Sequence, residues 1–170
     1  MANQPVSMLA IRSCTIYLSA MATHPHPDPV DPFADYLCFS LYAANLAVGR
    51  RYKPLLDPLG LTYPQYLVLV ALRETGAQPV GALGDRLCLE TNTLTPLLKR
   101  MEAAGLVTRR RNPADERVVL VGLSAKGADL AERARAVPAQ LMDGRIADIP
   151  RLSALNAELK ALRAALAEQA

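Results

Sequence analysis

The chain contains 170 residues, of which 51% are hydrophobic and 5% aromatic, and its formal net charge is +3. This length and apolar content are enough to bury one sizeable core, so we expect a single domain. The small net charge excludes a histone-like polycation. Alanine and leucine are abundant and tryptophan is absent, which favours helix over sheet and predicts a mainly α (α+β) fold.

The positive charge is concentrated in one stretch. From Lys99 to Arg117 the chain has six basic and three acidic residues, so this segment carries as much net charge as the whole chain. A local basic patch of this kind is the footprint expected for contacts with phosphates, and a solvated charged loop is the alternative.

Three cysteines, Cys14, Cys38 and Cys88, are far apart in the sequence. They form neither a disulfide framework nor a zinc-ligand spacing, which favours a reducing cytoplasm and gives no reason to expect a metal or another cofactor. The apolar segment 8–22 is interrupted by Arg12 and is too short to cross a membrane, so we expect no membrane association.

Residues 1–30 differ from the rest of the chain. Between residues 23 and 32 a proline stands at every second or third position, which excludes a regular helix. We interpret residues 1–30 as a disordered arm, or as the product of a start codon assigned too early, with Met21 as the true start. Residues 31–170 then form the folded domain.

Two helices are predicted next. Asp31 is a suitable N-cap with Pro32 at the first helical position, and the amphipathic pattern that follows continues to about Leu56. A second helix is expected from Thr62 to the segment Gly76–Pro79. The apolar stripe of the first helix consists of Phe33, Leu37, Leu41, Ala44 and Val48.

Residues 62–123 have the pattern of a winged helix-turn-helix. A short helix at Val80–Leu87 is followed by a second one, Thr91–Ala104, which has its apolar residues on one side and Gly105 as its stop. Two alternating segments and a turn predict a basic wing: Leu106–Arg111, Arg117–Leu123 and Asn112–Asp115. In such a fold the second helix can enter a DNA major groove while the wing reaches the adjacent minor groove.

The C-terminal segment is also predicted to be helical. Ser124 is a suitable cap for a helix that runs to about Ala136, and Pro138 is expected to end or kink it. A last helix, Arg151–Ala167, has leucines at heptad-like spacing, which is typical of a helix that packs against a partner. Residues 31–60 and 124–170 are therefore predicted to be dimerisation helices.

The residue types on the second helix and the wing suit contact with DNA. Threonine and asparagine near a helix N-terminus can hydrogen-bond base edges, whereas Lys99 and Arg100 suit the phosphate backbone. Arg117 beside Asp115 resembles an arginine that a carboxylate holds for entry into a minor groove, with an ordinary turn ion pair as the alternative. The candidate DNA-binding residues are Thr91, Asn92, Thr93, Thr95, Pro96, Lys99, Arg100, Arg109, Arg110, Arg111, Asp115 and Arg117.

Several motifs resemble the MarR family of dimeric winged-helix repressors: LGDRL, TNTLTPLLKRMEAAGLVTRRR, the triplet Asp115–Glu116–Arg117 and LSAKG. The resemblance extends from Asp31 to the C-terminus. It implies a homodimer that binds a pseudo-palindromic double-stranded DNA operator, with two recognition helices in successive major grooves about one helical turn apart.

Within that family, the segments LCFSLY, YKPLLDPLGLTYPQY and LTPLLKRME are similar to the organic-hydroperoxide-sensing subgroup called OhrR. In that subgroup the cysteine of the LCF motif, here Cys38, is the peroxide sensor, and tyrosines that match Tyr42, Tyr52 and Tyr63 surround it. Two-cysteine members have a resolving cysteine toward the C-terminus, a position with no counterpart here. The resemblance therefore implies that Cys38 is oxidised to a sulfenic acid, which then forms a mixed disulfide with a low-molecular-weight thiol or is over-oxidised. A disulfide between Cys38 and Cys14 is an alternative.

The chemistry of such a sensor is consistent with these residue types. A thiol reacts with peroxide as its thiolate, and phenol O–H groups in an apolar pocket are suitable hydrogen-bond donors to it. Tyr42 follows Cys38 by four residues and can reach it on the same helix face. Tyr52 follows by fourteen residues, about 21 Å along a straight helix at about 1.5 Å per residue, so it can serve Cys38 only across a dimer. Oxidation could then alter subunit packing and the spacing of the two DNA-reading heads.

Competing interpretations remain open at this point. Cys38 could be a buried small hydrophobe, and Cys88, which lies between two leucines, is expected in the core. The predicted function is a repressor, not an enzyme, that releases its operator when an organic hydroperoxide oxidises Cys38. The alternative is a MarR-type repressor that a small phenolic ligand releases without covalent chemistry.

Overall fold

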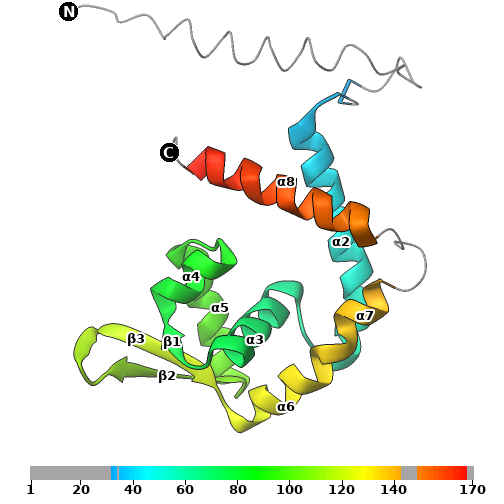
Figure 1. The fold of residues 1–170 in the computed structure, drawn as a ribbon. Coiled ribbons are helices and arrows are strands. Elements are labelled where there is room, and N and C mark those ends of the chain that lie inside the picture. The colour runs from blue at the N-terminus through cyan, green and yellow to red at the C-terminus, as the bar shows by residue number, and fades with distance from the viewer. Residues whose placement is uncertain (1–31, 34, 143–148, 168–170) are drawn as a thin grey trace, which may run out of the picture. The chain divides into compact units, whose positions relative to one another are not determined.

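The computed structural model describes residues 32, 33, 35–142 and 149–167 (Figure 1). The expectations for residues 1–30, Cys14 and the cap Asp31 lie outside these residues. Two compact units divide the chain, one ending at Val48 and one beginning at Gly49, and each is described by itself.

The first unit contains a turn and most of helix α2 (Leu37–Leu56). The prediction of a helix that starts at Pro32 is wrong, because Pro32 and Phe33 lie in a turn. The amide of Tyr36 donates to the carbonyl oxygen of Phe33 at 3.0 Å, a bond three residues long, and the first four-residue helical bond runs from Ser40 to Tyr36 at 3.0 Å. The helix therefore begins about one turn later than its apolar pattern suggests.

The second unit begins in the last turns of α2, which a 3₁₀ turn at Asp57–Leu59 follows. Helix α3 (Tyr63–Thr75) starts where predicted, because the side chain of Gln65 accepts the otherwise unpaired amide of Thr62 at 2.9 Å. It ends at Gly76, whose φ of 72° lies in the left-handed region that glycine tolerates.

Helices α4 (Val80–Leu87) and α5 (Thr91–Ala103) form the predicted helix-turn-helix. Gly105, with a φ of 72°, ends α5, and Leu106 closes the turn by donating its amide to the carbonyl oxygen of Met101 at 2.9 Å. The helices pack on one apolar core. Its fully buried members include Val68, Leu69, Leu83, Leu94, Leu98, Met101 and Val121.

The wing is a three-stranded antiparallel sheet rather than the predicted two-stranded ribbon. Its order is β1 (Gln78–Pro79), β3 (Asp115–Leu123), β2 (Val107–Asn112), with Val107 opposite Leu123. A two-residue strand has no alternating pattern that a sequence could reveal, so β1 was not expected. The turn is also shorter than predicted, because the side chain of Asn112 accepts the amide of Ala114 at 3.1 Å and closes it early.

Helix α6 (Ala125–Arg133) begins as predicted, with the Ser124 hydroxyl accepting the amide of Gly127 at 2.9 Å. The expected ending is wrong: α6 stops at Arg133, a 3₁₀ turn spans Ala134–Ala136, and Pro138 lies in the first turn of α7 (Val137–Leu141). Proline is tolerated there because the first amides of a helix have no intrahelical acceptor. The last helix is α8 (Ile149–Ala167).

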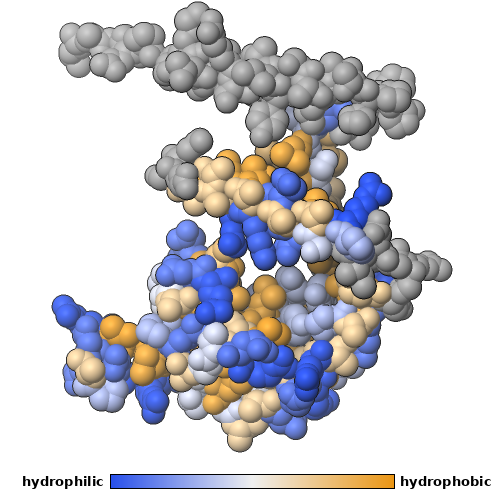
Figure 2. Space-filling view, viewed as in Figure 1, coloured by the Kyte–Doolittle hydropathy of each residue, from blue (hydrophilic) through white to orange (hydrophobic). Residues whose placement is uncertain are grey.

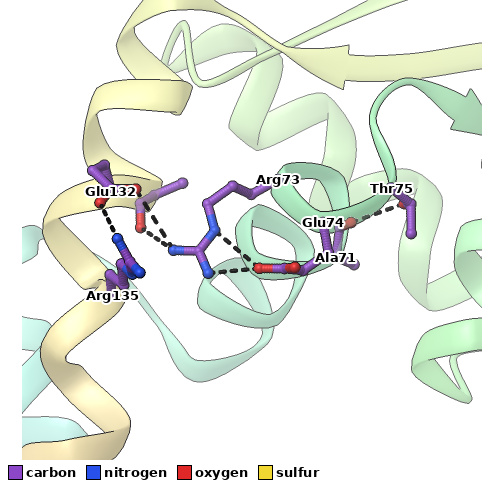
Figure 3. Close-up of polar contacts among 7 residues, drawn as sticks. Ala71, Arg73, Glu74, Thr75, Glu132 and Arg135 are labelled. Atoms are coloured by element: carbon purple, nitrogen blue, oxygen red, sulfur yellow. Dashed lines mark hydrogen bonds and ion pairs between the residues drawn. The ribbon is translucent and has the colours of Figure 1, made fainter.

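A polar cluster fastens α6 to α3 in addition to their apolar contact (Figure 3). Arg73 on α3 donates to the carbonyl oxygen of Ala131 at 3.5 Å and lies 3.9 Å from the carboxylate of Glu132. It also pairs with Glu74 at 2.6 Å. These contacts place the start of the C-terminal helices against the helix-turn-helix core.

Among the described residues, no single helix is long and apolar enough to cross a membrane. The segments Leu37–Leu59 and Tyr63–Thr75 would meet both conditions only if they were taken together across a bend.

Candidate functional site

Helix α5 separates its residues cleanly into two faces. Leu94, Leu97, Leu98 and Met101 are buried in the core. The polar residues between them remain outside: Thr91, Asn92, Thr93, Pro96, Lys99 and Arg100 are exposed, and Thr95 is half-buried. A helix fixed by its apolar face and presenting hydroxyl, amide and cationic groups outward has the chemistry that a major groove requires.

Pro96 lies inside α5 without ending it. It has no amide hydrogen to donate to the carbonyl of Asn92, the residue four positions earlier, so that oxygen lacks its usual helical donor. Asn92 also accepts a hydrogen bond through its side chain from the Thr93 hydroxyl at 3.2 Å. The exposed N-terminal turns of α5 are therefore rich in groups that can pair with base edges.

The wing carries an arginine that a carboxylate holds in place. Asp115 accepts from the Arg117 backbone amide at 3.1 Å, from its Nε at 3.1 Å and from its Nη2 at 3.4 Å. The hydrogen bonds from the Arg117 side chain, and then from its amide, hold the pKa of the Asp115 carboxyl below its usual value. Because 91% of the Arg117 side chain is exposed, the guanidinium is oriented yet open to a ligand.

The three arginines of β2 are not equivalent. Arg110 is exposed, and Arg111 is exposed and donates to the carbonyl oxygen of Glu116 at 3.0 Å. Arg109 instead pairs with Glu102 at the end of α5, and only 24% of its side chain is exposed. Sequence reasoning missed Glu102, although an acid seven residues before a strand arginine, across the Gly105 turn, was a usable signal.

A groove of about 440 Å³ lies between α5 and the wing. Thr91 and Thr95 line it from the helix, Arg109 and Arg117 from the wing, and the remaining lining is largely apolar. The structure thus brings the predicted helix and wing residues to one side of the second unit.

In the first unit, Cys38 is an exposed thiol on α2. Tyr42 lies one turn later, is 59% exposed, and has its ring centroid 6.4 Å from that of Phe39. The buried-hydrophobe interpretation of Cys38 therefore does not describe the single chain.

In the second unit, Tyr52 and Tyr63 belong to a cluster of three phenols. The ring centroids of Tyr52 and Tyr63 are 4.6 Å apart, and Tyr66 lies 5.8 Å from Tyr52. Burial, and then the neighbouring phenols, raises the pKa of Tyr52 to about 12, and burial raises the pKa of Tyr63 and Tyr66. All three phenols keep their protons at neutral pH and can donate hydrogen bonds. Sequence reasoning missed Tyr66, which the helical spacing from Tyr63 could have suggested.

The expectation that Cys88 lies in the core is wrong. Cys88 is exposed and follows the last residue of α4 with a φ of 54°, the only positive φ of a non-glycine residue in the described part of the chain. Its sulfur accepts a hydrogen bond from Nη1 of Arg163 on α8 at 3.2 Å.

Comparison with known proteins agrees with this geometry. A model of the MarR family matches residues 61–119. The organic hydroperoxide resistance transcriptional regulator of Bacillus subtilis is 49% identical over 106 residues, which cover 62% of this chain and 72% of the relative. The HTH-type transcriptional regulator TtmR of Methylorubrum extorquens is 44% identical over 132 residues, covering 74% and 68% respectively.

Two solved structures extend the likeness to DNA-bound proteins. One is reduced AbfR bound to DNA; AbfR is a protein of Staphylococcus epidermidis. It superposes with a TM-score of 0.70 at 32% identity, covering 79% of this chain and 94% of that one. A mutant MarR from Escherichia coli complexed with operator DNA gives a TM-score of 0.68 at 26% identity, covering 78% and 98%. The chain therefore belongs to the MarR family of winged-helix transcriptional regulators and is a DNA-binding regulator rather than an enzyme.

Proposed function

We propose that the chain is a homodimeric repressor that binds a pseudo-palindromic operator and releases it when an organic hydroperoxide oxidises Cys38. The observation that carries this proposal is the exposed Cys38 thiol, placed on an apolar helix face in a chain that is 49% identical to an organic hydroperoxide resistance regulator. An exposed thiol among apolar side chains suits an apolar peroxide better than a polar one.

The exposed apolar residues support a dimer. In a single chain, the following large hydrophobic residues of the first unit are 39–61% exposed: Phe33, Tyr36, Leu37, Phe39, Tyr42, Leu46 and Val48. On α8, Leu155, Leu159 and Leu166 are also exposed, and Figure 2 shows hydrophobic colours on this helix beside its charged residues. Exposed large apolar side chains that gather on one element mark interaction sites, and a second copy of the chain would cover them.

Two copies would present two recognition helices to the DNA. In a symmetric dimer these helices enter successive major grooves about one helical turn apart, so we expect a pseudo-palindromic site. We expect Lys99 and Arg100 to contact phosphates and Arg117 to enter a minor groove; the exposure of all three supports this.

The proposed sensor reaction balances with the peroxide as the oxidant. The Cys38 thiolate attacks the terminal hydroxyl oxygen of the peroxide and the O–O bond breaks. The products are a sulfenic acid and an alkoxide, which takes up a proton from solvent to become the alcohol. A low-molecular-weight thiol then condenses with the sulfenic acid, forming a mixed disulfide and releasing water. Phenol donors stabilise the attacking thiolate: Tyr42 from the same helix, and Tyr52 and Tyr63 from the partner subunit.

This function is tested by titrating an operator complex with cumene hydroperoxide. We expect the wild-type protein to release the duplex and to gain one oxygen, or a mixed disulfide when a thiol is present, at Cys38 by mass spectrometry. Cys38→Ser should bind the operator normally and remain bound, and Cys88→Ser is the matched control that should release like the wild type. Normal release by Cys38→Ser would refute the sensor assignment.

One observation favours a second candidate function. A cavity of about 330 Å³ adjoins the phenol cluster and is lined by Lys53, Leu56, Leu61 and Tyr63, a setting suited to a small phenolic ligand. Release of the operator by such a ligand under reducing conditions, unchanged in Cys38→Ser, would establish this alternative.

The DNA-reading surface is tested by salt dependence. Each phosphate contact that is lost should reduce the slope of log affinity against log salt by about one. We expect this for Lys99→Ala, and we expect Arg117→Ala to lower the affinity through loss of its minor-groove contact. If neither variant changes affinity or slope, the proposed surface is wrong.

A further inference from the structure

A carboxylate joins the end of the recognition helix to the first strand of the wing. Oε2 of Glu102 accepts from Nε and Nη2 of Arg109, each at 2.9 Å, and Oε1 accepts from the Arg109 backbone amide at 3.2 Å. The bond to the amide fixes the strand itself and not only a side chain. Because β2 lies at the edge of the sheet, the same bond satisfies an edge donor that would otherwise need water.

This contact gives Arg109 a role different from that of the other wing arginines. Both Arg109 and Arg117 pair with a carboxylate, but the side chain of Arg109 is only 24% exposed, against 91% for Arg117. Two charge-assisted bonds that converge on one oxygen, Oε2 of Glu102, restrict the orientation of the guanidinium as well as its position. Arg109 therefore connects the wing to α5 through its ion pair with Glu102.

Within the described residues, this link is the direct side-chain hydrogen-bonded connection between α5 and β2. The groove of about 440 Å³ separates Thr91 and Thr95 of the helix from Arg117 of the wing. Open volume between the two elements leaves the hairpin room to tilt about its base. A tie near that base, at Glu102, would limit the tilt.

We propose that Glu102 is a positioning residue for DNA binding: it holds the wing at a fixed angle to α5 and so determines where Arg117 stands relative to the recognition helix. Arg109 is its partner and not a phosphate ligand. The inference rests on the proposed DNA-reading surface.

Charge and positioning predict opposite results when Glu102 is removed. If only charge matters, removing an acidic side chain from a DNA-facing surface should tighten binding to operator and non-operator duplexes alike. Loss of positioning should weaken operator binding while leaving non-specific binding as tight or tighter, because non-specific binding needs only charge. The ratio of operator to non-specific affinity therefore distinguishes the two roles.

The experiment measures that ratio for the full-length Glu102→Ala protein at fixed salt. We expect a fall of about ten-fold, the size expected when one groove contact is lost. Glu90→Ala is the matched control, since Glu90 is an exposed acid that precedes α5, and it should change both affinities by the same factor. In the Glu102→Ala background, Arg117→Ala should have little further effect on operator binding.

Thermal unfolding of each variant separates positioning from folding. Glu102→Gln keeps the side-chain length and one acceptor oxygen, so it should show a smaller fall in the same ratio with an unchanged melting temperature. An unchanged ratio in both Glu102 variants, or an equal cost of Arg117→Ala in both backgrounds, would overturn the inference. If Arg117→Ala has no effect in either background, the proposed reading surface fails and this inference fails with it.

Discussion

Gly127 in α6 offers a sharp test of how the helix-turn-helix and the C-terminal helices fit together. A Cβ at this position would overlap the carbonyl oxygen of Leu106 and lie 2.9 Å from its carbonyl carbon. Both partners are backbone, so no side chain can move aside. The same Leu106 oxygen accepts the amide of Ser124 at 3.1 Å, and separating the two segments would lose that bond.

The magnitude for Gly127→Ala follows from these contacts. Overpacking costs about 1–3 kcal/mol, and loss of the Ser124 hydrogen bond adds about 1 kcal/mol. Alanine in a helix returns about 0.5–1 kcal/mol relative to glycine. The net loss in the free energy of unfolding is about 1–3 kcal/mol, which for a chain of this length lowers the melting temperature by about 3–10 °C.

Urea and thermal unfolding followed by circular dichroism measure this loss. Gly81→Ala in α4 is the matched control, because a Cβ there meets nothing within 4 Å. We expect it to be as stable as the wild type or more stable by up to about 1 kcal/mol. If Gly127→Ala is as stable as Gly81→Ala, the close approach of α6 to Leu106 is not a feature of the folded protein.

Three further predictions concern individual groups. Because the folded state raises the pKa of Tyr52 to about 12, it holds a proton that the unfolded chain gives up near pH 10, so stability should fall between about pH 10 and pH 12; Tyr52→Phe should flatten this fall in unfolding measurements. Asp115→Ala should weaken operator binding several-fold in a fluorescence titration despite removing a negative charge, because Arg117 loses the carboxylate that orients it; tighter binding would contradict that role. Leu98→Ala should lower the free energy of unfolding by about 2–5 kcal/mol, since Leu98 is fully buried; a urea midpoint equal to that of the wild type would contradict its place in the core.

The regular part of the fold could be predicted because periodicity and caps act locally. In α5, leucines at helical spacing identified the buried face, and Gly105 marked the end. The same reasoning placed the Ser124 cap of α6 correctly. The predicted start of α2 was wrong because Pro32, which could begin a helix, lies in a turn instead. The apolar spacing continues through the turn and the helix, so it does not mark the boundary.

The candidate site was predictable only in part. Exposed threonines and cations on α5 followed from the same periodicity, but the Glu102–Arg109 link depends on how a strand folds back on a helix. Cys88 looked buried because leucines flank it, yet a positive φ at the end of α4 turns it outward. Pairing across a turn and backbone direction at a helix end depend on three-dimensional geometry that spacing does not encode.

The central claim is that Cys38 reacts because phenols of a second chain stabilise its thiolate. It is tested most directly with two mixed dimers that each retain one Cys38. In the first, one subunit has Cys38→Ser and the other Tyr52→Phe; in the second, a wild-type subunit is paired with one that has both changes.

The measurement is the rate at which cumene hydroperoxide oxidises the single Cys38 in each mixed dimer. If Tyr52 acts across the dimer, the first mixed dimer retains an intact pair and should react at the wild-type rate per thiol, whereas the second should react more slowly. The reverse order, or a protein that remains a monomer, would contradict the account.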